Sequence, residues 1–297
     1  MNCYLCDSVE NFQRDGKVRD NPNIKILECS NCGLVFLNTN EADEEFYKHN
    51  KMNDADFFKF AQRDYGTDTQ QAIRILSKDR ESQIKRRLEF VQNTIIGKDL
   101  LDFGSGRAEF LIMAKEFAKS VVGVEIEEQV ETIYKENDIR LARSIADLGG
   151  GVYDIITAFH VLEHLKDPIN ILKQLKERMR DSQSKIIVEV PTGSDALLTL
   201  FKNKAYSEFI YWSAHLYYFT PATLTMLAQK AGLHVDFVKG IQRYPLSNTL
   251  YWLSFGKPAG QKVWGNFLDN PILQQAYENT LASLGATDTL IAQFSKA

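Results

Sequence analysis

From residue 99 onward, short apolar runs rich in β-branched residues alternate with amphipathic stretches. The apolar runs predict strands at 100–103, 120–124, 153–158, 185–190, 233–238 and 289–294. The amphipathic stretches predict helices at 108–117, 128–136, 168–178 and 221–231. Alternation of this kind is typical of a parallel sheet that helices cover on both faces, so we expect an α/β fold.

The chain before residue 99 has a different pattern. Residues 71–91 keep apolar positions at helical spacing, and we interpret the basic residues among them as a solvated helix face: Arg74, Lys78, Arg80, Lys85, Arg86 and Arg87. Residues 41–70 are polar and acidic with interspersed aromatic residues. They predict a linker that packs its rings on the main domain, in preference to an arm that contacts substrate.

These patterns divide the chain into three parts. Residues 1–40 form a small cysteine-bearing unit, 41–90 a helical linker and 91–297 the main domain. The segment 241–285 is long for a connection between two strands, and it predicts either a substrate lid or a contact in a homodimer.

Composition narrows the protein class. The 297 residues are 44% hydrophobic and carry a net charge of −4, which excludes a disordered chain. No apolar run approaches the roughly 20 residues of a membrane-spanning helix, and the N-terminus lacks the pattern of a secretory signal. We therefore expect a cytoplasmic protein with no membrane partner. The charge also disfavours nucleic acid as a partner.

All four cysteines lie in the first 32 residues. They form two C-x2-C pairs, Cys3 with Cys6 and Cys29 with Cys32. Two disulfides or a redox pair are the alternatives, but a cytoplasmic chain disfavours stable disulfides, and redox pairs usually occur singly. The spacing predicts a zinc ribbon whose Zn²⁺ is structural, because four thiolates leave no open coordination position. Gly33, and Asp7 at the matching place, are expected to adopt positive φ in the two turns.

A glycine loop follows the first predicted strand of the main domain. It reads Asp102-Phe-Gly104-Ser105-Gly106-Arg-Ala108-Glu109, and the second strand ends at Glu125. The lysine of a phosphate-binding P-loop is absent. A dinucleotide fingerprint would need a small residue where Glu109 stands, and a carboxylate there would repel a pyrophosphate. Glu125 stands where an acidic residue can accept hydrogen bonds from ribose hydroxyls.

The form D-x-G-x-G-x-A resembles the first motif of class I S-adenosylmethionine-dependent methyltransferases. Residues 153–168, 188–191 and 215–232 are similar to later segments of that family, so the resemblance covers about 100–240 and a final strand. It implies a Rossmann-like seven-stranded methyltransferase sheet with S-adenosyl-L-methionine as cofactor. The cofactor-binding residues that it implies are Asp102, Gly104, Ser105, Gly106, Glu125, Ile126, Asp147, Phe159 and His160.

The same resemblance implies that a base removes a proton from the acceptor. Histidine suits this role because it titrates near neutral pH. We favour His215, with His160 and His164 as further candidates, and expect no role for His49 or His234. In sugar C-methyltransferases that carry a ribbon, a glutamate precedes this histidine. Here Ala214 stands in that place, which favours transfer to oxygen or nitrogen.

The four-cysteine unit ahead of this domain resembles methyltransferases of sugars and surface-polysaccharide building blocks. The resemblance implies a small-molecule acceptor, a sugar or sugar nucleotide. Two alternatives are an RNA or protein methyltransferase, and a zinc-ribbon protein that binds a partner while its methyltransferase-like domain is not catalytic.

Overall fold

The computed structural model describes residues 1–39, 48 and 69–297. Its central sheet has the strand order β10-β11-β8-β7-β4-β5-β6. The strands are β4 (Asp99–Phe103), β5 (Ser120–Val124), β6 (Arg140–Ala142), β7 (Ile155–Phe159), β8 (Lys185–Pro191), β10 (Leu233–Ile241) and β11 (Thr289–Lys296). The seven-stranded α/β fold is confirmed. All six predicted strands are present, and the three-residue edge strand β6 was not predicted.

The sheet is not wholly parallel. β4, β5, β6, β7 and β8 pair in parallel, as the alternating pattern predicted. β11 enters between β10 and β8 and runs antiparallel to both. The prediction of a parallel sheet is therefore wrong for β11. After β10 the chain passes through a helical segment and returns in the opposite direction, so that its final strand lies between β10 and β8.

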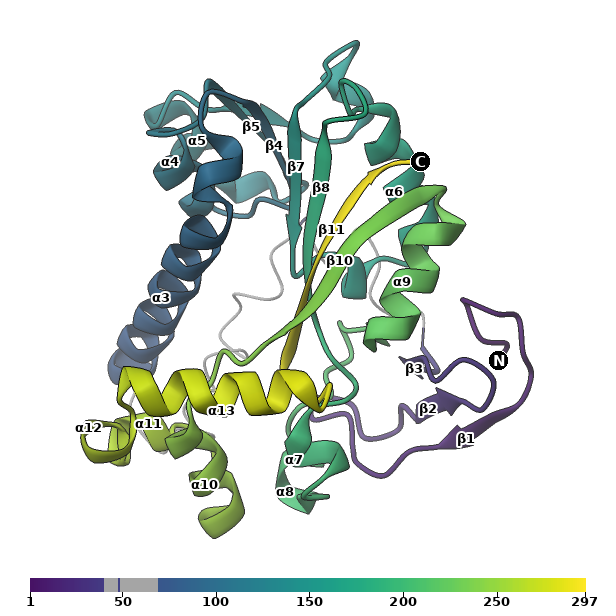
Figure 1. The fold of residues 1–297 in the computed structure, drawn as a ribbon, viewed down its shortest axis with the longest axis vertical. Coiled ribbons are helices and arrows are strands. Elements are labelled where there is room, and N and C mark those ends of the chain that lie inside the picture. Colours follow the sequence, from purple (N-terminus) through teal and green to yellow (C-terminus); the bar gives the residue numbers. More distant parts are fainter. Residues whose placement is uncertain (40–47, 49–68) are drawn as a thin grey trace.

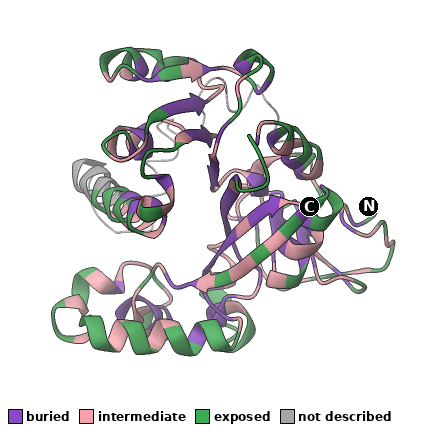
Figure 2. Ribbon diagram, turned by 45° about the horizontal axis from the view of Figure 1, so that its top comes forward, coloured by how far each residue is buried: buried purple, intermediate pink, exposed green. Residues whose placement is uncertain are grey.

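Helices cover both faces of the sheet (Figure 1). α3 (Thr69–Ile95), α4 (Glu109–Ala114) and α5 (Glu131–Glu136) lie on one side, and α6 (Pro168–Glu177) and α9 (Pro221–Lys230) on the other. Alternate strand residues face the two layers: Leu100 packs with α3 and α4, whereas Leu101 packs with the core that includes α6 and α9. Figure 2 shows the central strands largely buried and the outer helix faces exposed. The predicted helices are thus present, within several residues of their predicted ends.

The cysteine-bearing unit forms a separate four-stranded sheet. Its order is β1 (Asn11–Gln13), β2 (Ile26–Cys29), β3 (Val35–Leu37) and β9 (Tyr217–Tyr218). Gly33 has φ 77° and Asp7 has φ 59°, so the predicted left-handed turns are confirmed. The two turns repeat one pattern, because Asp7 N donates to Cys3 O and Gly33 N donates to Cys29 O, each at 2.9 Å.

The segment between β10 and β11 is mostly helical. It contains α10 (Leu246–Phe255), α11 (Gly260–Val263), α12 (Gly265–Leu268) and α13 (Pro271–Ser283), which lie together below the sheet in Figure 1. Shorter helices precede β9, namely α7 (Ala196–Thr199) and α8 (Lys204–Ser207). A lid and a homodimer contact stay predictions for 241–285, as does the three-part division of the chain.

Some predictions fall outside the described residues. These are His49 and the aromatic residues of the linker, Phe46, Tyr47, Phe57, Phe58, Phe60 and Tyr65. Among the residues that are described, no helix is long and apolar enough to cross a bilayer.

Candidate active site

The glycine loop turns sharply between β4 and α4. Gly104 and Gly106 have φ of 72° and 51°, conformations that favour glycine. A Cβ on Gly104 would lie 2.4 Å from Val161 Cγ2, so only glycine allows this close approach. A Cβ on Gly106 would meet no protein atom within 4 Å, and the backbone there borders open space.

That open space belongs to a cavity of about 720 Å³ at the carboxyl ends of β4, β5 and β7. Ligands of open α/β sheets bind at this edge. The walls include Asp102, Gly104, Ser105, Gly106, Glu125, Ile126, Phe159 and His160. The structure therefore brings together eight of the nine predicted cofactor residues. Asp147 is absent from the lining, and its carboxylate accepts a hydrogen bond from Ser144 Oγ at 2.9 Å.

Two carboxylates give this end of the cavity its chemistry. Glu125 accepts hydrogen bonds from Gly106 N at 2.7 Å and from Glu127 N at 2.9 Å, which fixes its position and leaves lone pairs for ligand hydroxyls. Burial raises the pKa of Asp102 to about 7, although a 2.6 Å hydrogen bond from Thr157 Oγ1 opposes the rise. The residues present thus fit a nucleoside that carries an ammonium group and a net positive charge, as S-adenosylmethionine does.

Three histidines meet beside this loop. His160 follows β7, and His164 ends the short helix η4 (Leu162–His164); both line the cavity. His164 Nδ1 lies 2.9 Å from Ala214 O. His215 is not in the lining, and its ring centroid lies 4.7 Å from that of His164. The exposed His234, in β10, is likewise absent from it.

The environment of these rings sets their charge. Burial lowers the pKa of His164, and it lowers the pKa of His215 well below its usual range. Both rings are therefore neutral at neutral pH. Burial alone would raise the pKa of Glu163, but interactions with His160, above all the hydrogen bond at 2.9 Å, outweigh it and that pKa is lowered. The site thus combines neutral imidazoles with an ionised carboxylate.

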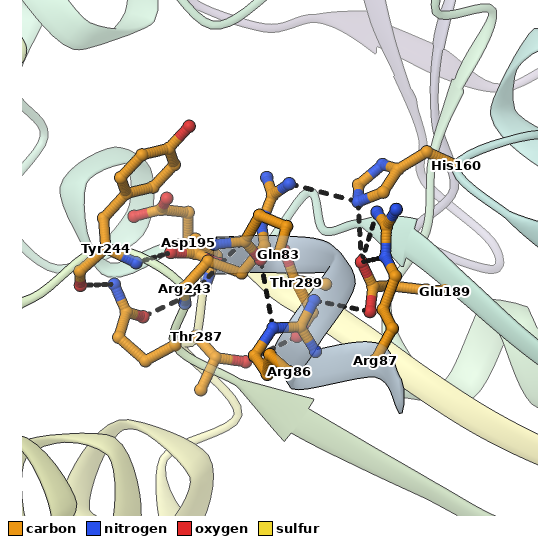
Figure 3. A network of polar contacts seen from close by, with 12 residues as sticks. Gln83, Arg86, Arg87, His160, Glu189, Asp195, Arg243, Tyr244, Thr287 and Thr289 are labelled. Atoms are coloured by element: carbon orange, nitrogen blue, oxygen red, sulfur yellow. Dashed lines mark hydrogen bonds and ion pairs between the residues drawn. The ribbon is translucent and has the colours of Figure 1, made fainter. Parts of the chain in front are cut away.

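Glu189 anchors a polar network below His160 (Figure 3). Its side chain is fully buried in β8, and it contacts Arg86 Nη2 at 2.7 Å, Arg87 Nη2 at 2.9 Å and His160 Nε2 at 3.1 Å. Arg243 Nη1 also lies 3.1 Å from His160 Nε2. The prediction of a solvated helix face is wrong for Arg86 and Arg87, because the one buried carboxylate draws both guanidinium groups inward. Arg80 lines the cavity as Arg87 does, but its side chain is 46% exposed, which agrees with the predicted solvated face.

Two clusters in the described part of the chain could hold a metal ion. Cys3 Sγ lies 3.5 Å from Cys32 Sγ, and Cys6 Sγ lies 3.4 Å from Cys29 Sγ. No disulfide joins these cysteines, and their ligand atoms all lie within 4.8 Å of one another. Glu163, His164 and His215 form the second cluster within the same limit. Two imidazoles and a carboxylate are ligands that a transition-metal cation accepts.

Sequence reasoning did not identify Arg87, Glu189 and Arg243 as residues of this site. One local feature of the sequence could have indicated a role for Glu189, because it is a charged residue inside the otherwise apolar run 186–190. Arg243 had none, because its partners His160 and Asp288 lie far away along the chain.

Comparisons with known proteins agree with this geometry. Residues 76–236 match the family described as "Methyltransferase domain". The chain is 26% identical over 170 residues to a ubiquinone biosynthesis O-methyltransferase from Aeromonas salmonicida, covering 52% of this chain and 70% of that protein. It is 24% identical over 200 residues to the enzyme of that name from Hydrogenovibrio crunogenus, covering 58% and 82%.

Among solved structures, a SAM-dependent methyltransferase from Archaeoglobus fulgidus is similar in fold. It is 20% identical in sequence, and it aligns with a TM-score of 0.48 over 81% of this chain and 99% of that chain. Magnesium protoporphyrin IX methyltransferase from Synechocystis PCC 6803 aligns at 14% identity and a TM-score of 0.49 over 83% and 97%.

The family match spans more than half of the chain and contains the glycine loop, Glu125 and all three clustered histidines. The chain therefore belongs to this methyltransferase family and is a class I S-adenosylmethionine-dependent methyltransferase.

Proposed function

We propose that this enzyme methylates a hydroxyl oxygen of a small-molecule acceptor and that His164 removes the proton. One observation carries the proposal: a neutral His164, held by Ala214 O, lies in the wall of the cavity that the glycine loop borders. The names of the sequence relatives, O-methyltransferases of ubiquinone biosynthesis, support oxygen as the methylated atom.

The tautomer of His164 follows from its partner. A carbonyl oxygen only accepts, so Nδ1 must donate its hydrogen to Ala214 O. The lone pair of the neutral ring is then on Nε2, which can accept a proton. Glu163 Oε1 lies 4.0 Å from Nε2, and its negative charge stabilises the imidazolium that forms.

The other two histidines are less suited to this step. His160 has Glu163 at Nδ1 and both Glu189 and Arg243 at Nε2, so its ring is held in the buried polar network. His215 lies behind His164, and its Nδ1 is buried with no hydrogen-bond partner among the described residues. We therefore place His164 ahead of His215, which the sequence favoured.

The apolar side chains of the cavity wall indicate what the acceptor resembles. Phe110 and Phe159 meet edge to face with ring centroids 5.1 Å apart, and Ile84 lies in the same lining. Arg87 lies over the Phe159 ring at 5.2 Å. Apolar and aromatic walls suit a hydroxylated ring, and we infer that an aromatic acceptor fits better than a sugar nucleotide.

The chain's own residues set up the reaction. Bound S-adenosylmethionine supplies an activated methyl group on a sulfonium. Asp102 and Glu125 hold ligand groups at the loop, and His164 holds the acceptor hydroxyl and takes its proton. Positioning the acceptor oxygen close to the methyl donor is a large part of what these residues contribute.

Cofactor binding tests this function through pH. S-adenosylmethionine carries a net positive charge, which favours ionised Asp102. In the protein without cofactor the pKa of Asp102 is about 7, so protonation of this carboxylate competes with cofactor binding below that pH. Calorimetric titrations should therefore show affinity falling about tenfold between pH 8 and 6.

Asp102→Asn should abolish this pH dependence, and Glu125→Ala should weaken binding at every pH. Glu116→Ala, an exposed glutamate outside the cavity lining, is the matched control. If the folded wild-type protein does not bind the cofactor, the proposed function is wrong. If it binds, methylation of hydroxylated aromatic compounds and of sugar nucleotides should be compared.

We also propose that the four cysteines hold a structural Zn²⁺. Sulfur atoms bound to one zinc ion at 2.3 Å lie about 3.8 Å apart, close to the 3.4 and 3.5 Å found here. Elemental analysis should find one zinc per chain. Cys29→Ser should lose most of it and unfold at lower temperature, whereas Ser30→Ala, with its exposed side chain, should retain it. Full zinc content in Cys29→Ser would contradict the site.

A further inference from the structure

The four-cysteine unit is physically continuous with the segment that carries His215. β3 pairs antiparallel with β9, matching Val35 with Tyr218 and Phe36 with Tyr217. One residue further, Leu37 N donates to Leu216 O at 3.0 Å. The unit therefore holds the main-chain residues that come directly after His215.

A loop of the same unit holds the residues that precede His215. Arg19 N donates to Tyr211 O at 2.9 Å. The Asp20 carboxylate accepts a hydrogen bond from Ser213 N at 3.0 Å and another from the Ser213 hydroxyl. Bonds to a carboxylate are stronger than neutral ones, so Asp20 is the tightest polar contact between the loop and this segment.

Ala214 and His215 lie between these two attachments. Ala214 O is the acceptor that sets the tautomer of His164, and Leu216 N donates to Glu163 O at 2.7 Å. A shift of this segment would therefore move the carbonyl that orients His164.

Shared burial strengthens the connection. Val18, Ile26 and Val35 of the four-cysteine unit form one buried cluster with Tyr211 and Tyr218. No residue of 1–39 lines the described cavity. The unit also contacts the main domain elsewhere, since Ile169 N donates to Tyr4 Oη at 3.0 Å and Arg14 Nη2 donates to Gly193 O at 2.7 Å, but the segment 211–218 carries the carbonyl that orients His164.

We propose that the four-cysteine unit is a positioning element of the methyl-transfer site and that Asp20 is a positioning residue for His164. It acts through Ser213 and the neighbouring Ala214 carbonyl, without touching either reactant. The inference rests on the role of His164 in the proposed function, but its test does not require methyl transfer.

The test uses the full-length, zinc-containing protein with ¹⁵N-labelled histidine. Nuclear magnetic resonance distinguishes the two tautomers of a neutral imidazole, and His164→Gln identifies the His164 signals. We expect wild type to show Nδ1–H at His164. Asp20→Ala should shift these signals toward a mixture of tautomers, while the affinity for S-adenosylmethionine changes less than twofold.

Two further variants complete the design. Asp20→Asn keeps an oxygen acceptor for Ser213 N and should restore the wild-type signals. Asp15→Ala changes an exposed acidic residue of the same loop and should have no effect. Once an acceptor substrate has been identified, Asp20→Ala should lower kcat about 10- to 100-fold with little change in KM for the cofactor.

An unchanged His164 spectrum in Asp20→Ala would overturn the inference, whatever the activity does. A shifted spectrum in a protein that binds the cofactor but methylates no hydroxyl would support the positioning role and refute the proposed function instead.

Discussion

Glu189→Ala is expected to lower the free energy of unfolding by about 3–5 kcal/mol, the largest stability effect among our predictions. The Glu189 side chain is fully buried and is the common partner of Arg86, Arg87 and His160. Without it, two guanidinium groups would face each other near the sheet with no compensating charge. Removing one partner of a buried ion pair leaves the other charge buried without a counter-charge, and its desolvation penalty is then no longer offset.

Urea denaturation followed by circular dichroism measures this loss. Glu177→Ala, an exposed glutamate at the end of α6, is the control and should cost less than about 1 kcal/mol. Burial alone would raise the pKa of Glu189, but His160 and the two arginines hold it well below 4.5. The contribution of Glu189 to the free energy of unfolding is therefore complete above its unfolded-state pKa. It is lost only as the pH falls through the lower folded-state pKa. An effect equal to that of the control would contradict the prediction.

His164→Gln is expected to lower kcat by about 10²–10⁴-fold, the usual effect of removing a general base. Glutamine can still donate a hydrogen bond to Ala214 O, but it cannot accept a proton at neutral pH. The affinity for S-adenosylmethionine should stay within a few-fold of wild type, because the loop residues that bind it are unchanged. Steady-state kinetics and calorimetry on the same preparations measure both quantities.

The pH profile gives an independent check. Burial lowers the pKa of His164 below 6.5, so the ring is already deprotonated at neutral pH. The wild-type kcat should therefore be constant above neutral pH and fall only under acid conditions. His234→Gln, with its exposed side chain, should behave as wild type. A large loss in His215→Gln but not in His164→Gln would identify His215 as the base.

The cofactor end of the site could be predicted from the sequence because its chemistry is local. Positive φ at Gly104 and Gly106, a strand before the loop and an acidic residue ending the next strand all lie within some 25 residues of one another. The same holds for Cys3, Cys6, Cys29 and Cys32, whose spacing predicts their convergence. Asp147 shows the limit, because the short helix η3 (Ala146–Leu148) leaves its side chain outside the cavity lining.

What the sequence by itself determined is therefore the fold class, the glycine loop and the four-cysteine cluster, since hydrophobic periodicity and turn residues act between near neighbours. Only the tertiary structure decided the position of β11, the inward direction of Arg86 and Arg87, and the pairing of β3 with β9. Each depends on partners from distant parts of the chain; Arg86 and Glu189 are 103 residues apart. No local pattern specifies such a partner, because the contact becomes favourable only after the sheet has brought both residues to the same buried place.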